Sequence, residues 1–245
     1  KSVDEKEHGW PSEVCGPSAI AFDDGWIVPK ELTVEEIKEI TNNFVKTAKL
    51  ALKAGFDFVE IHGAHGYLIS SFLSSTSNQR TDQYGGSFEN RIRLLLDVVK
   101  NVRAVWPKQK PLAVRLSCDE WYDNKGWNID DTVKLVRHLI DLGVDMIDCS
   151  SGGNNPKQKI AIKPGYQVHF AEKVKSTYGN KVTVGAVGLL TEPQQCNNII
   201  KNKQADVVLL ARQLLRDPNF VLNAAAALNA DISHPPQYQR WLGRL

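Results

Sequence analysis

Short apolar runs alternate with amphipathic stretches along most of this chain. The runs are bounded by turn-forming residues, and their length suits strands that are covered on both faces, as in parallel sheets. Five strands are therefore predicted, at residues 56–62, 111–117, 144–150, 181–187 and 205–211.

Helical periodicity fills the intervals between these runs. Thr33 and Glu36 have the spacing of a capping box, and apolar residues then recur at helical spacing from Ile37 to Leu52. The same reasoning predicts helices at residues 87–106 and 133–140, and two short helices that begin near Pro193 and Pro218.

The alternation of strand and helix predicts an α/β fold with a parallel sheet, since parallel neighbours require crossover connections. No GxGxxG follows a predicted strand, so a dinucleotide-binding first unit is not indicated. The strand spacing fits a (β/α)8 TIM barrel, of which five strands are apparent. We therefore expect a single domain over residues 1–245, with a loop at 1–32 before the first helix and a C-terminal arm at 234–245.

The amino-acid composition limits which kinds of binding partner are expected. The 30 basic and 28 acidic residues leave a net charge of +2, which gives no electrostatic reason to expect nucleic acid or an anionic membrane. No apolar run is long enough to span a bilayer. The four cysteines form no CxxC pair, so we expect free thiols in the cytoplasm and neither a disulfide framework nor a zinc site. The only methionine is Met146, which predicts that Lys1 is not the native start.

The polar stretch HGAHGYLISSFLSSTSNQRTDQYGG directly follows the first predicted strand. His62 ends that strand, and Gly63 and Gly66 permit a sharp turn. That turn brings His65 and Tyr67 close to His62, at the strand end where parallel barrels carry their active sites. Two imidazoles there can donate hydrogen bonds to a developing oxyanion, with Tyr67 as a proton donor. The spacing fits a structural histidine pair equally well. Metal binding through HxxH is the weakest interpretation, because no zincin glutamate follows.

The second strand carries a charged residue on one face. Ala113, Arg115 and Ser117 share that face because side chains alternate along a strand. If the face points into a barrel, the guanidinium of Arg115 requires a partner. An anionic ligand and an ion pair with Glu60 of the neighbouring strand both remain open.

The last two strands end in motifs suited to phosphate. Gly188 lies in a GxxG after the penultimate strand, and Ala211 and Arg212 follow the last one. Barrels commonly bind phosphate at this position, although tight strand–helix packing also requires glycine. Arg212 favours phosphate. Flavin mononucleotide (FMN) fits the whole set, with its phosphate at these three residues and Arg115 near the electron-rich edge of the ring.

The segment HGAHGYLISSFLSSTSNQRTDQYGGSFENR resembles the signature of the Old Yellow Enzyme family of flavin-dependent ene-reductases. The segments AVRLS, DCSSGG, PGYQV, GAVGLLTEPQQ, ARQLLRDP and PPQYQRW resemble the thermophilic-type branch of that family. The motifs occur in family order, and the likeness covers essentially all 245 residues.

The resemblance implies an FMN-bound barrel that takes hydride from NADPH or NADH. It passes the hydride to the β-carbon of an activated alkene, an α,β-unsaturated carbonyl or nitro compound. His62 and His65 match the pair that holds the substrate oxygen, with Gly63 and Ala64 between them in the substrate site. Tyr67 matches the donor of a proton to the α-carbon.

The resemblance also implies roles for more distant residues. Arg115 matches the arginine at the flavin pyrimidine edge, while Gly188, Ala211 and Arg212 match phosphate contacts. Arg240 matches an arginine that enters the neighbouring subunit's active site, which implies a homo-oligomer, a dimer or tetramer.

The family's first three strands have no counterpart in residues 1–30, so the chain is expected to hold strands four to eight. No cysteine matches the family's redox-tuning cysteine. Two rival functions remain open: a barrel fragment that holds no flavin, and a phosphate-binding isomerase or aldolase. The absence of lysine at any predicted strand end argues against the Schiff-base chemistry of an aldolase.

Overall fold

Five parallel strands form the centre of the fold, in the order β3-β4-β5-β6-β7. The computed structural model describes residues 3–123, 125–233 and 235–237. The strands are β3 (Val59–Gly63), β4 (Leu112–Ser117), β5 (Met146–Ser150), β6 (Thr183–Val187) and β7 (Val207–Leu209), with a separate ribbon of β1 (Cys15–Gly16) and β2 (Lys30–Glu31). The five predicted strands are confirmed.

Helices occupy the connections between these strands. They are α1 (Val34–Lys53), α2 (Leu68–Leu73), α3 (Phe88–Arg91), α4 (Arg93–Val105), α5 (Ile129–Asp141), α6 (Val168–Tyr178), α7 (Pro193–Lys201), α8 (Arg212–Arg216) and α9 (Phe220–Ala227). The capping box at Thr33 and Glu36 is present, because each side chain bonds to the other residue's backbone N–H. Among the described residues, no helix combines the length and hydrophobicity needed to cross a membrane.

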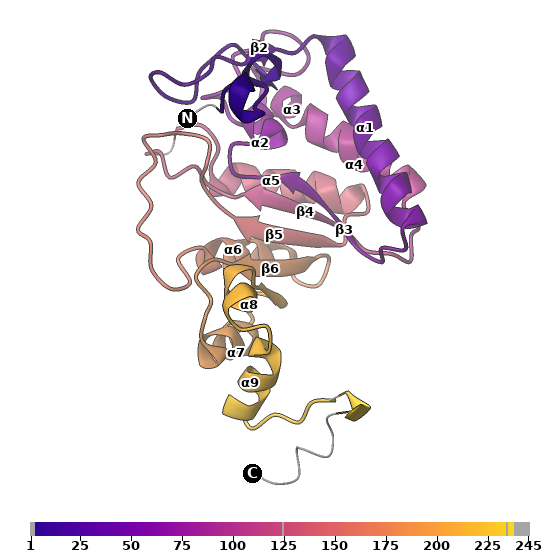
Figure 1. The fold of residues 1–245 in the computed structure, drawn as a ribbon, viewed down its shortest axis with the longest axis vertical. Coiled ribbons are helices and arrows are strands. Elements are labelled where there is room, and N and C mark those ends of the chain that lie inside the picture. Colours follow the sequence, from indigo (N-terminus) through magenta and orange to yellow (C-terminus); the bar gives the residue numbers. More distant parts are fainter. Residues whose placement is uncertain (1–2, 124, 234, 238–245) are drawn as a thin grey trace.

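The strand order matches an arc of a barrel. Each strand pairs with the next one along the chain, whereas a doubly wound sheet reverses its order at a switch point. The helices follow the same progression, since α1 contacts α4, α4 contacts α5, and α5 contacts α6. Figure 1 shows this progression from α1 and α4 at one end of the sheet to α7 and α9 at the other.

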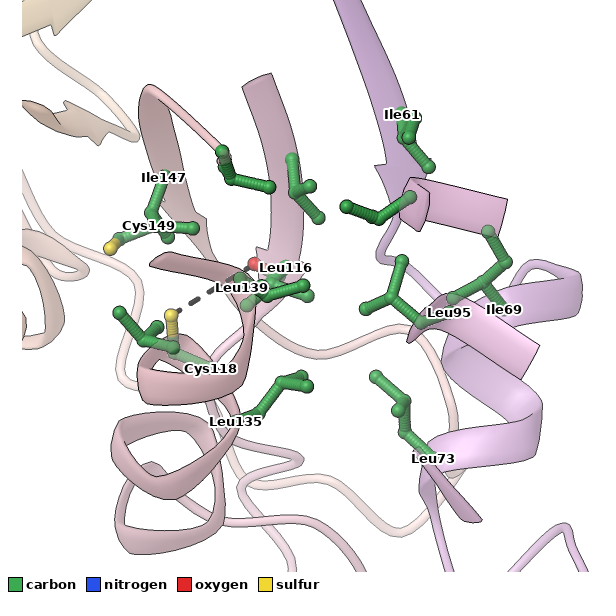
Figure 2. Packing of buried hydrophobic residues seen from close by; sticks show 14 of the residues in the cluster. Ile61, Ile69, Leu73, Leu95, Leu116, Cys118, Leu135, Leu139, Ile147 and Cys149 are labelled. Atoms are coloured by element: carbon green, nitrogen blue, oxygen red, sulfur yellow. Dashed lines mark hydrogen bonds between the residues drawn. The ribbon is translucent and has the colours of Figure 1, made fainter. Parts of the chain in front are cut away.

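The two faces of the sheet differ in chemistry. The register aligns Ile61, Val114, Ile147 and Val184 across four strands, and all four are buried. Figure 2 shows side chains of this face, such as Ile61 and Ile147, in one cluster with Leu95 of α4 and Leu139 of α5. The neighbouring row aligns His62, Arg115 and Asp148, whose side chains point to the opposite face because of strand alternation.

Two expectations about local structure need correction. The helix predicted over residues 87–106 is interrupted at Ile92. On either side, Arg91 donates to the carbonyl of Leu73 at the end of α2, and Arg93 donates to the carbonyl of Gln83 in the following loop. Residues 3–32 are not a loop throughout, since β1 and β2 pair there and two 3-10 turns precede them, Glu5–Glu7 and Pro11–Glu13.

Candidate active site

The turn after β3 depends on glycine at two positions. A Cβ on Gly63 would lie 3.1 Å from the carbonyl oxygen of Arg115, so a larger residue would crowd the backbone of β4. Gly66 has a φ of +73°, and a Cβ there would lie 2.0 Å from the carbonyl oxygen of Gly153. His65 also has a positive φ, of 62°, which completes the reversal of the chain.

This turn brings together the three predicted catalytic side chains. The ring centroids of His62 and His65 are 5.2 Å apart, and those of His62 and Tyr67 are 5.3 Å apart in an edge-on arrangement. His62 and Tyr67 are exposed, whereas His65 is half-buried. Gly63 and Ala64 are buried, and Ala64 is 0% exposed. The catalytic roles of these residues stay predictions.

Hydrogen bonds with serine hydroxyl groups, which are linked in turn to a glutamine amide, hold His65 in position. Its backbone N–H donates to Ser117 Oγ at 2.8 Å, and its Nε2 lies 2.6 Å from Ser150 Oγ. Ser150 Oγ also lies 3.4 Å from Gln167 Oε1, and Gln167 Nε2 donates to the carbonyl of Val187 at 3.0 Å. The sequence analysis did not identify Ser150 or Gln167 as site residues, although both lie in segments that carried the family resemblance.

The surroundings of both imidazoles favour the neutral form. Burial, and then the positive charge of Arg115, lowers the pKa of His62. The same two causes, with His62 as a third, lower the pKa of His65 to about 4. A neutral imidazole has one N–H donor and one acceptor nitrogen. His62 is therefore able to donate one hydrogen bond to an oxygen without bringing a positive charge. His65 can do the same from Nδ1–H when the Ser150 hydroxyl donates to its Nε2.

The ion-pair partner of Arg115 is Asp148. Among the described residues, Arg115 Nε lies 3.1 Å from Asp148 Oδ2 on β5, and the ion pair with Glu60, one of the two alternatives, is not formed. The register explains the difference, because Arg115 is aligned with His62 and Asp148, while Glu60 is aligned with Ala113. Glu60 lies near enough for Arg115 to oppose the increase that burial causes in the pKa of Glu60.

The predicted phosphate residues lie at the ends of β6 and β7, which pair side by side. Gly188 has a φ of +115°, and a Cβ there would lie 2.6 Å from Gln167 Nε2. Ala211 and Arg212 follow β7 at the same edge of the sheet, where α8 begins. Gly188 and the first residue of α8, the exposed Arg212, therefore follow two paired strands at this edge.

These features fit a flavin mononucleotide. The edge at Gly188 and Arg212 offers donors for a phosphate. Arg115, aligned with His62 in the register, is 28% exposed and supplies a positive charge for an electron-rich ring edge. Among the described residues, no cluster of three histidine, cysteine, aspartate or glutamate side chains is arranged to hold a metal ion. Arg240 lies outside the described residues.

Comparison with known proteins agrees with this description. The model of the NADH:flavin oxidoreductase / NADH oxidase family matches residues 4–231. The chain is 47% identical over 235 residues to an NADPH dehydrogenase of Clostridium acetobutylicum, covering 96% of this chain and 68% of that protein. It is 45% identical over 228 residues to an NADPH dehydrogenase of Bacillus subtilis, covering 93% of this chain and 66% of that protein. The chain thus spans about two thirds of the length of these relatives.

Solved structures share the fold. An Old Yellow Enzyme homologue from Zymomonas mobilis superposes with a TM-score of 0.69 at 25% identity, covering 90% of this chain and 62% of that one. Morphinone reductase in complex with tetrahydroNAD superposes with a TM-score of 0.73 at 24% identity, covering 92% of this chain and 62% of that one.

Proposed function

Because the chain belongs to the NADH:flavin oxidoreductase / NADH oxidase family, we propose that it forms the greater part of an FMN-dependent NAD(P)H oxidoreductase. The proposed reaction is reduction of the activated C=C bond of α,β-unsaturated carbonyl or nitro compounds. The observation that carries the proposal is the grouping of His62, His65 and Tyr67 at the end of β3, on the sheet face that also carries Arg115.

The residues of the chain would hold the cofactor at two points. Gly188, Ala211 and Arg212 would bind the phosphate, and Arg115 would contact the pyrimidine edge of the ring. Reduced flavin, when bound, supplies the hydride that NADPH or NADH has delivered to it.

His62 and His65 would hold the substrate oxygen by two N–H donors. Negative charge moves onto this oxygen as the alkene is reduced, so donors placed beforehand stabilise the transition state more than the ground state. Neutral rings suit this role, because each donates a hydrogen bond to the substrate oxygen without carrying a positive charge. Tyr67, exposed beside His62, would hold the proton for the α-carbon.

Replacing His62 with alanine tests this proposal. Loss of one oxyanion donor typically lowers the rate by about 10²–10³-fold. We expect His62→Ala to slow alkene reduction by that factor and to weaken binding of phenolic ligands. Flavin reduction by NADPH should change much less. The rates are measured by stopped-flow absorbance in separate reductive and oxidative half-reactions.

A matched control is His138→Ala, because His138 is an exposed histidine in the last turn of α5. It should leave both half-reactions unchanged. Unaltered ligand affinity in His62→Ala would remove His62 from the site. A chain that takes up no FMN, followed by absorbance in the flavin bands, would contradict the proposal and favour the barrel fragment without flavin.

A further inference from the structure

The carboxylate of Asp148 is buried in the sheet beside Arg115. Asp148 lies in the middle of β5 and is only 2% exposed. Its Oδ2 is 3.1 Å from Arg115 Nε, yet neither Asp148 Oδ1 nor Arg115 Nε has a hydrogen-bond partner among the described residues. Burial of a carboxylate whose oxygens lack hydrogen-bond donors costs free energy. Such a carboxylate binds a proton more readily than an exposed one.

The groups that face Asp148 differ in charge. From β4 it faces Arg115, and from β3 the groups nearby are Glu60 and His62, while its neighbour on β6 is Gly185, which carries no charge. Burial raises the pKa of Asp148 to about 7, Glu60 adds to the increase, and Arg115 opposes it. Asp148 therefore changes its charge near neutral pH, within contact distance of a guanidinium.

We infer that Asp148 is a positioning residue that holds the Arg115 guanidinium and sets the net positive charge that Arg115 presents to the flavin. The inference rests on the proposed flavin site. When Asp148 is ionised, it cancels part of the charge of Arg115. When it is protonated, Arg115 presents its full charge to the ring.

This arrangement predicts a pH-dependent effect on flavin reduction. The pyrimidine edge of a flavin gains negative charge on reduction, so a more positive Arg115 favours the reduced form. Asp148→Asn behaves as a permanently protonated Asp148. At pH 8 we expect this variant to favour reduced over oxidised flavin about tenfold more than the original protein does. A tenfold change is about 30 mV in the two-electron midpoint potential. At pH 6 the two proteins should differ little.

The Arg115 side chain gives a second readout that needs no flavin. In the chain without FMN, the NMR signal of the Arg115 Nε–H group should shift with pH, with a midpoint near 7. Asp148→Asn should abolish that shift. The control is Asp145→Asn, which alters the aspartate directly before β5. Asp145 accepts hydrogen bonds from the Leu112 N–H at 2.8 Å and from Arg103 Nη1 at 3.0 Å. It should leave the Arg115 shift and the flavin potential unchanged.

The flavin midpoint potential and the Arg115 NMR signal together distinguish failure of this inference from failure of the proposed flavin site. An Arg115 signal that does not respond to Asp148 overturns the inference, whether or not flavin binds. A response at Arg115 in a chain that takes up no FMN refutes the proposed flavin site and leaves the ion pair established. If FMN binds and Asp148→Asn has the original potential at pH 8, Asp148 does not set the charge, and the inference is wrong.

Discussion

Replacing Arg80 with methionine should detach the N-terminal segment, residues 3–32, from the loop that follows α2. The Arg80 side chain is 5% exposed. Its Nη1 donates to the carbonyls of Pro17 at 3.0 Å and Leu32 at 2.6 Å, one on each side of the segment's long loop. Its Nε and Nη2 donate to the carboxylate of Asp82 at 3.0 Å and 2.6 Å. One guanidinium therefore ties the β1–β2 ribbon to the polar stretch after α2.

The magnitude follows from the partners that methionine would leave behind. Methionine keeps much of the buried volume, but the Pro17 and Leu32 carbonyls lose the Arg80 donor and Asp82 loses its ion-pair partner. Asp82 keeps the Tyr84 N–H as a donor. A buried group without its partner costs about 1–3 kcal/mol, and breaking a buried ion pair costs about 3–5 kcal/mol. Asp82 retains 34% exposure and regains some hydration from water. We therefore expect the free energy of unfolding to fall by about 3 kcal/mol.

Urea denaturation followed by tryptophan fluorescence measures this loss. Limited proteolysis locates it, since cleavage should begin within residues 3–32. Arg137→Met is the control, because Arg137 and Asp141 form an exposed i,i+4 pair at 3.0 Å that contributes no more than about 0.5 kcal/mol. If Arg80→Met is no more destabilising than Arg137→Met, the reasoning about this buried network is wrong.

The decrease in the free energy of unfolding at acidic pH tests the same network. The hydrogen bond from Arg80 is the main cause that lowers the pKa of Asp82. A carboxylate with a lowered folded-state pKa stabilises the fold above its unfolded pKa, near 4, and this contribution is lost as the pH falls further. The loss below about pH 4 should be smaller in Arg80→Met than in the original protein.

Two further predictions concern the site and the assembly. Tyr67→Phe should slow the oxidative half-reaction with an alkene modestly, since water replaces the proton donor for some substrates; an unchanged rate and an unchanged solvent isotope effect would exclude Tyr67 as the donor. Deleting residues 237–245, which include Arg240, should weaken the proposed oligomer and the substrate affinity together; retention of both, by light scattering and ligand titration, would refute a shared role for the arm.

Several features of this protein follow from the sequence alone because their causes are local. Capping at Thr33 depends on a residue three positions away, and strand alternation depends on the pleat. The five strands and the parallel α/β class were predictable for that reason. The nearness of His62, His65 and Tyr67 also follows from two glycines within five residues.

Tertiary structure decided the partners of the charged groups. Glu60 and Asp148 were equally available to Arg115 by residue type, and the alignment of β3, β4 and β5 selected Asp148. Arg80 reaches carbonyls that lie 63 and 48 positions earlier in the chain. Register and long-range contact arise from the simultaneous packing of several elements, which no local pattern encodes. The sequence therefore supplied the chemical groups at the strand ends, and the packing of the sheet determined which of them meet.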